Sequence, residues 1–260
     1  SGYGFNQGHA TAYAAVSFAM AYVKARWPAA FFCARLMSRG GFHHPAVYMA
    51  EAVRLGCTIR PPHVNVSRRR FTLTWEGEDP VLWMGLGWVR DLRRGAVDAI
   101  VTQRGGRPFA GLRDLMRRVD LQEREVAHLI QGGALDGLGE SRRALLAQAA
   151  EIARAGSPLQ LSLFETARSD RVQTPSESLT QRVAWERHLL GYPLSGLREP
   201  LALVAEQLPP YTPLGKLSET AGRPVTVAGV RLPGWTGGKG FYLWDGETWV
   251  IARTGKGQRS

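Results

Sequence analysis

The sequence lacks the features of a membrane or secreted protein. It contains no apolar run of the ~18 residues that a membrane-spanning helix needs, and no basic segment followed by an apolar one at its start. Only two cysteines occur in 260 residues, Cys33 and Cys57, and they have no CxxC spacing. This usage favours a reducing compartment and argues against a structural zinc site. We therefore predict a cytoplasmic chain that has no membrane partner and no bound metal.

The motifs of common catalytic centres are also missing. There is no DxD pair of the kind that holds two Mg²⁺ ions for phosphoryl transfer. There is no Walker loop, no GxSxG and no HExxH. His43 and His44 are adjacent and precede Pro45, so both rings cannot easily face one metal, and a polar loop is the simpler interpretation. We therefore predict no catalytic residues and no cofactor in this chain.

Acidic residues are too few to balance the basic ones. The sequence has 33 Lys and Arg against 22 Asp and Glu, which gives a net charge of +11. Such an excess favours a polyanionic partner, of which nucleic acid is the most common.

The pattern along the chain predicts a mainly α fold with a small β part. Residues 9–37 are expected to form two apolar helices, and residues 45–56 a third that begins at Pro45. Residues 58–78 alternate and contain prolines, which indicates an extended segment and a short strand. Small helices are expected from about Gly87 to Ala150, and three short strands joined by Gly-rich turns after residue 223.

The segment "GGALDGLGESRRALL" predicts a helix, a tight turn and a new helix that begins near Ser141. Glycines before a helix let backbone N–H groups approach a phosphate, and the helix dipole favours an anion there. Two arginines in the first turn oppose the dipole and make sense if a phosphate binds. The predicted DNA-binding residues of this unit are Gly132, Gly133, Gly137, Gly139, Ser141, Arg142 and Arg143. An ordinary connection between two helices remains the alternative.

The segment Met84 to Val119 has the same helix, turn, helix pattern, with the basic turn "WVRDLRRG". Its predicted DNA-binding residues are Arg90, Arg93, Arg94 and Gly95. Two such units in tandem would hold a nucleic-acid backbone without regard to base sequence.

Several passages resemble, in the same order, the bacterial DNA polymerase III alpha subunits, which are the family C DNA polymerases. "GFNQGHATAYA" and "YVKARWPAAF" are similar to the family's fingers segment, GFNKSHAxxYA followed by YLKAHYPxEF. "AVRLGCTIRPPHVNVSRRRF" and "ERHLLGYPLSG" are similar to two further family passages. Met84 to Leu146 resembles the tandem helix-hairpin-helix region, and "VTVAGVRL" resembles the start of the OB-fold.

The resemblance implies a helical fingers segment, a tandem helix-hairpin-helix domain and a partial OB-like β segment. The chain starts without an initiator Met, and we expect it to be a fragment whose palm domain, with the catalytic carboxylates and Mg²⁺, lies N-terminal to it. The implied parts are the end of the fingers (1–60), the tandem helix-hairpin-helix domain (61–155), a clamp-binding linker (156–182), a connecting helix and loop (183–222) and a partial OB-like domain (223–260).

The fingers resemblance implies a nucleotide pocket lined by Asn6, Gln7, His9 and Tyr13. The family's Lys-Ser is Gln7-Gly8 here, so one expected cation is missing. Plain core packing of Tyr13 is the alternative. The first hairpin also departs from the family, because Asp91 and Arg93 stand where its glycines are expected.

The pentapeptide "QLSLF" resembles the family's sliding-clamp-binding peptide, whose consensus is close to QLxLF, and it follows the hairpin region. The implied clamp-binding residues are Gln160, Leu161, Ser162, Leu163 and Phe164. The two C-terminal side chains would anchor in an apolar pocket of the clamp. The alternative is that they fold back onto a neighbouring helix of the same chain.

The predicted function is therefore part of a DNA-directed DNA polymerase of the polymerase III alpha type. The expected partners are duplex DNA as primer-template, the sliding clamp and possible further polymerase III holoenzyme subunits. Without a palm, the chain alone is expected to be inactive. The alternatives are an error-prone translesion polymerase of the same family and a stand-alone DNA- and clamp-binding module without a palm.

Overall fold

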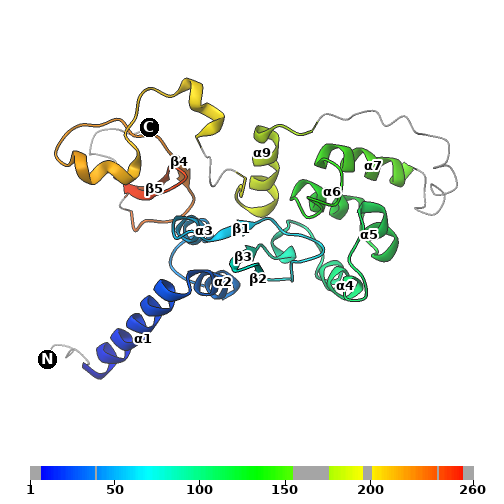
Figure 1. Ribbon diagram of the computed structural model, residues 1–260, viewed down its shortest axis with the longest axis horizontal. Helices are drawn as coiled ribbons and strands as arrows, with labels where there is room; N and C mark the ends of the chain where they lie inside the picture. The colour runs from blue at the N-terminus through cyan, green and yellow to red at the C-terminus, as the bar shows by residue number, and fades with distance from the viewer. Residues whose placement is uncertain (1–6, 39, 155–175, 196–200, 239, 254–260) are drawn as a thin grey trace.

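The fold is mainly α-helical with a small β part, as predicted (Figure 1). The computed structural model describes residues 7–38, 40–154, 176–195, 201–238 and 240–253. The helical elements are α1 (Gln7–Arg26), α2 (Pro28–Ser38), α3 (Pro45–Arg54), η1 (Leu86–Trp88), α4 (Arg94–Arg104), α5 (Leu112–Arg118), α6 (Glu123–Gln131), α7 (Arg142–Arg154), α9 (Leu179–Leu190), η3 (Ala202–Gln207) and η4 (Leu214–Thr220). The strands are β1 (Thr58–Arg60), β2 (Thr72–Glu76), β3 (Asp79–Trp83), β4 (Val230–Leu232), β5 (Phe241–Trp244) and β6 (Trp249–Ala252). Across the described ranges, no helix is both long and apolar enough to cross a membrane.

The first three helices begin and end where the sequence predicts. Pro28 and Pro45 open α2 and α3, because a proline at the first helical position loses no hydrogen bond. Gly56, at φ +82°, follows the end of α3. α1 buries no residue and extends away from the other elements, with the N-terminus at its far end (Figure 1).

A three-stranded sheet lies next to α2 and α3. β3 is its central strand, parallel to β1 and antiparallel to β2. The sequence predicted an extended segment and one short strand here, and the structure adds β3. Val81 and Leu82 are adjacent apolar residues after Pro80, and both are buried, so the two-residue alternation of a half-buried strand does not reveal this strand.

One hydrophobic core joins α2, α3 and the first sheet to the helices α4–α7. Its buried residues run along the chain from Ala29 to Leu194. The large side chains Phe32, Leu82, Ile100 and Leu129 are each 1% exposed or less. The division of the chain into the parts named above stays a prediction.

The second sheet, β4–β5–β6, is antiparallel throughout and packs against α3. Tyr242 and Trp244 form a small core with Val47 and Ala50 of α3. The Trp249 Nε1–H donates to Glu51 of α3 at 3.0 Å. The three predicted strands are therefore present, whereas an OB barrel needs five, so the OB assignment stays a prediction.

Candidate nucleic-acid interface

The second hairpin unit joins α6 to α7 through a glycine-rich turn. Gly133 has φ +83°, and an added Cβ would lie 2.5 Å from the guanidinium of Arg142, so this position requires glycine. Gly139 has φ +123° and is exposed, with no atom within 4 Å of an added Cβ. Ser141 caps α7, because its Oγ accepts a hydrogen bond from the Ala144 N–H at 3.2 Å. Gly132 and Gly133 are buried, which corrects their predicted contact with DNA. Gly137 and Gly139 present exposed backbone beside the N-terminus of a 13-residue helix, a geometry that suits an anion.

Arg142 is a correction to the predicted DNA-binding set. Its side chain is only 2% exposed. The guanidinium donates to both carboxylate oxygens of Asp136, at 2.9 and 2.6 Å, to the Gln131 carbonyl at 2.8 Å and to Glu186 at 3.1 Å. Burial would lower the pKa of Arg142, but these two carboxylates outweigh it and raise the pKa. The anion that explains this arginine in the first turn is a pair of the chain's own carboxylates, not a phosphate.

Arg143 differs from Arg142 although they are neighbours. Its side chain is exposed, because one helical residue turns the next side chain by about 100°. It lies in the first turn of α7, beside the exposed glycine turn. Of the two arginines, only Arg143 is placed to reach a phosphate in solution.

The turn of the first hairpin, between η1 and α4, contains Asp91 at a position where the family has glycine. Asp91 has φ +58°, a conformation that aspartate tolerates better than most residues. Its carboxylate pairs with Arg124 of the second unit. The conformation expected of a glycine is therefore kept without the glycine, and the two hairpin units are joined at this point.

Arg93, the N-cap of α4, is held by Glu125 of α6. Glu125 accepts hydrogen bonds from the Arg93 backbone N–H at 2.9 Å and from its guanidinium at 2.9 and 2.8 Å. It also accepts from the Gln122 N–H at 2.9 Å. Burial alone would raise the pKa of Glu125, but these hydrogen bonds hold it at about 2. Glu125 thus accepts from the Arg93 N–H at the start of α4, and a phosphate would compete with it for the half-exposed Arg93 side chain.

The other predicted residues of the first hairpin are more open. Arg94 and Gly95 are exposed, and Arg94 lies 3.9 Å from Asp98, at the limit of an ion pair. The Arg90 side chain is also exposed. Its backbone N–H donates to the Leu189 carbonyl at 2.9 Å, so the hairpin is anchored to α9.

Both hairpins are braced by residues to which the sequence gave no role. Asn65 donates to the Phe109 carbonyl at 2.9 Å and accepts from the Phe109 N–H at 2.7 Å, which fixes the turn between α4 and α5. The Val64 N–H donates to the Ala134 carbonyl at 2.9 Å, and His63 Nε2 lies 3.1 Å from the Asp136 carbonyl, both in the second hairpin. The prolines of "PPHVNVS" hold this passage extended, but nothing in it indicates which distant residues it contacts.

Three of the four predicted nucleotide-pocket residues lie near the start of α1, the helix that extends away from the other elements. Gln7, His9 and Tyr13 are exposed, and Tyr13 is 62% exposed, which contradicts the alternative that it packs in a core. The His9 and Tyr13 rings meet edge to face with centroids 4.5 Å apart. Asn6 lies outside the described residues. The pocket stays a prediction.

The clamp peptide, Gln160 to Phe164, also lies outside the described residues.

Within the described part of the chain, no group of three or more His, Cys, Asp or Glu could hold a metal ion. The sequence does contain one DxE spacing, Asp245 to Glu247. This spacing forms a turn, because Asp245 accepts from the N–H groups of Glu247, Thr248 and Leu214.

Comparison with known proteins identifies the relatives of this chain. Residues 56–145 match the helix-hairpin-helix motif family. The error-prone DNA polymerase of Alkalilimnicola ehrlichii is 34% identical over 258 residues, which cover 96% of this chain and 25% of that protein. The DNA polymerase III subunit alpha of Haemophilus influenzae is 31% identical over 253 residues, and that of Campylobacter jejuni is 30% identical over 227 residues. These matches cover 88% and 80% of this chain but only 21% and 19% of the relatives.

The chain thus spans a quarter or less of the length of these relatives. The range that the helix-hairpin-helix family matches, residues 56–145, includes both hairpin turns. The chain is therefore homologous, along most of its length, to one region of the bacterial DNA polymerase III alpha and error-prone DNA polymerase family.

Proposed function

We propose that this chain is part of a bacterial DNA-directed DNA polymerase of the polymerase III alpha type, in which its hairpin units bind the backbone of duplex DNA. The observation that carries the proposal is the turn from Gly137 to Ser141 at the N-terminus of α7, in which Gly137, Gly139 and Glu140 are exposed, with Arg143 exposed beside it. The net charge of +11 and the names of the relatives support it. Contacts of this kind fix a protein on DNA without reading the bases.

Substitution of Arg143 tests this proposal. The Arg143→Gln variant is expected to bind a fluorescein-labelled 20-base-pair duplex about three- to tenfold more weakly at physiological salt, because one phosphate contact is lost. The slope of log affinity against log salt should become less steep by about one. Fluorescence anisotropy measures both. The control is Arg223→Gln, which removes an equal charge from an exposed turn outside the hairpins; equal effects of the two variants would contradict the proposal.

The proposed function includes attachment to the sliding clamp through Gln160 to Phe164. A short peptide gives modest affinity, and a common DNA raises the effective concentration of the two partners. In a titration with purified clamp, the Leu163→Ala/Phe164→Ala variant should lose at least about tenfold in affinity, because both anchor side chains are removed. Thr166→Ala is the control, since Thr166 lies just outside the peptide. Unchanged clamp affinity in the double variant would refute the assignment.

The remaining parts of the polymerase are proposed by homology. Asn6, Gln7, His9 and Tyr13 would contribute to the nucleotide pocket. The catalytic carboxylates and their Mg²⁺ would come from a palm outside this chain, and the chain alone would not extend a primer. Further holoenzyme subunits and a cytoplasmic location belong to the same proposal.

The second candidate function is that of the error-prone branch. The Alkalilimnicola ehrlichii error-prone polymerase matches 96% of this chain, whereas the Haemophilus influenzae alpha subunit matches 88%. The identities, 34% and 31%, are too close to separate the branches. A stand-alone binding module would require a gene that encodes no palm, which the full gene sequence decides.

A further inference from the structure

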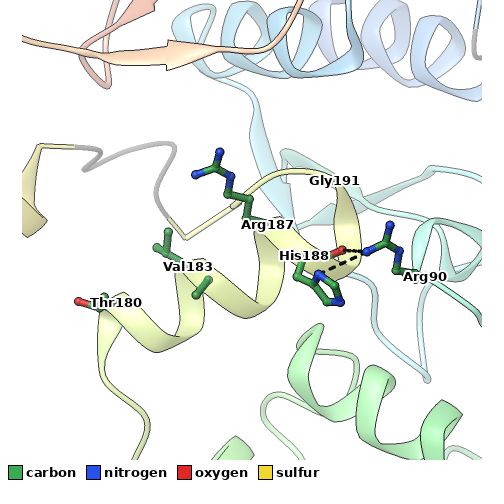
Figure 2. Close-up of a pocket in the computed structure, with 7 residues that line it drawn as sticks. Arg90, Thr180, Val183, Arg187, His188 and Gly191 are labelled. Atoms are coloured by element: carbon green, nitrogen blue, oxygen red, sulfur yellow. Dashed lines mark hydrogen bonds between the residues drawn. The ribbon is translucent and has the colours of Figure 1, made fainter.

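A hollow of about 620 Å³ lies beside the first hairpin and runs along α9, from Thr180 in its first turn to Gly191 just past its end. Figure 2 shows Arg187 extending from α9 and Arg90 reaching in from the hairpin, next to His188. The remaining lining residues are Thr180, Val183, Ala184 and Gly191. No residue of α9 was predicted from the sequence to bind DNA, nucleotide or clamp, so the sequence did not indicate this hollow.

The lining contains two arginines and one histidine, and no carboxylate. In the described part of the chain, neither Arg90 nor Arg187 has a carboxylate partner, whereas Arg182 on the same helix pairs with Glu177 at 2.9 Å and Arg93 pairs with Glu125 at 2.8 Å. Both arginines are exposed. An exposed guanidinium group without a carboxylate partner can bind a phosphate, which arginine contacts with parallel hydrogen bonds.

Arg90 also has a structural task. Arg90, from the first hairpin, contacts the C-terminal end of α9. Its backbone N–H donates to the Leu189 carbonyl. Its side-chain Nη1 lies 3.3 Å from His188 Nδ1 and 3.5 Å from the His188 carbonyl. The Arg90 carbonyl is held in turn by His128 Nδ1 at 2.7 Å. A cation here offsets the negative end of the helix dipole. Arg187 is also a cation in the last turn of α9, but among the described residues it donates no hydrogen bond to the end of the helix, so its loss tests anion binding more directly than the loss of Arg90.

We propose that Arg187 and Arg90 hold a phosphodiester of the duplex DNA that the first hairpin contacts, so that the DNA-binding surface continues onto α9. This inference rests on the proposed function and adds a site to it. A hollow of this volume accommodates more than one phosphate group, which favours a stretch of sugar–phosphate backbone over a free anion. Arg124 pairs with Asp91 and Arg93 with Glu125, so the two hairpin units use these arginines to hold each other. In our proposal α9 compensates for the phosphate contacts that these two arginines do not make.

The test is anisotropy titration of the 260-residue chain with the same 20-base-pair duplex. Arg187→Gln is expected to weaken binding about three- to tenfold and to reduce the salt slope by about one, as for the loss of one phosphate contact. Arg90→Gln should weaken binding too. The double variant should bind more weakly than either single variant, because each side chain contacts the same stretch of backbone. Equal melting temperatures of wild type and Arg187→Gln show that folding is unaffected.

The outcomes separate this inference from the proposed function. If Arg187→Gln binds no worse than the charge-matched Arg223→Gln while Arg143→Gln is impaired, the α9 site is refuted and DNA binding by the second hairpin stands. If wild type shows no salt-dependent duplex binding, both fail. A competition arm replaces sodium chloride by inorganic phosphate at constant ionic strength. No extra displacement supports a backbone site, and displacement that requires Arg187 would instead assign the hollow to free phosphate and overturn the proposal.

Discussion

Replacing Arg142 with methionine is expected to reduce the free energy of unfolding by about 3–5 kcal/mol, because removal of one partner leaves a buried charge uncompensated. Glu186 is fully buried and would keep only its hydrogen bonds from the Ser195 N–H and hydroxyl, both 2.8 Å. Asp136 and the Gln131 carbonyl would also lose their donor. Methionine preserves much of the side-chain volume, so the loss reports the charge rather than a cavity. Urea unfolding at pH 7 measures the change.

Arg143→Met is the matched control for this experiment. It changes the adjacent residue of the same helix in the same way, but on an exposed side chain. A surface substitution of this kind should alter stability by no more than about 0.5 kcal/mol. Removal of a cation from the first turn can even stabilise the helix slightly. Equal destabilisation by the two substitutions would contradict the structural role assigned to Arg142.

Replacing Glu125 with glutamine is expected to destabilise the chain by about 2 kcal/mol at pH 7. The charged carboxylate organises the first hairpin through Arg93 and the start of α6 through Gln122. Glutamine keeps one acceptor oxygen, and the half-exposed guanidinium is partly screened by water, so the loss is smaller than for Arg142. The measurement is again urea unfolding.

The same variant has a defined dependence on pH. The pKa of Glu125 is lowered from an ordinary value of 4.5 to about 2. The carboxylate therefore stabilises the fold fully above pH 4.5, and this stabilisation is lost as the pH falls towards 2. The difference in stability between wild type and Glu125→Gln should shrink over this window. Glu51, whose pKa is also held at about 2, chiefly by its hydrogen bond from Arg54, titrates equally in both proteins and cancels in the comparison. A difference that stays constant from pH 6 to pH 3 would rule out this account of Glu125.

Local pattern was enough to predict the helices and the position of both hairpin turns. Glycines, prolines and apolar spacing are properties of neighbouring residues, and they place α3, α6 and α7 without reference to the rest of the chain. The sequence could not separate Arg142 from Arg143. Their difference depends on the phase of α7 against α9, and Glu186, which lies 44 residues from Arg142, determines it.

In the first hairpin, too, the sequence could not predict which distant residues its charged side chains contact. The sequence identified Asp91 and Arg93 as departures from the expected glycines and allowed for arginine side chains that bind DNA. The structure pairs both residues with charges on α6, about 32 residues away. Such pairings have no local signature. The brace by His63 and Asn65 was missed for the same reason, because its partners lie 44 to 73 residues further along the chain.

The central claim is that this chain binds the phosphate backbone of duplex DNA. The most direct test is to measure the affinity of the wild-type chain for two duplexes of unrelated sequence, between about 50 and 200 mM salt. The account predicts steep salt dependence, with a slope of several, and the same affinity for both duplexes. An affinity that does not change with salt, or that differs by more than about tenfold between the duplexes, would contradict it.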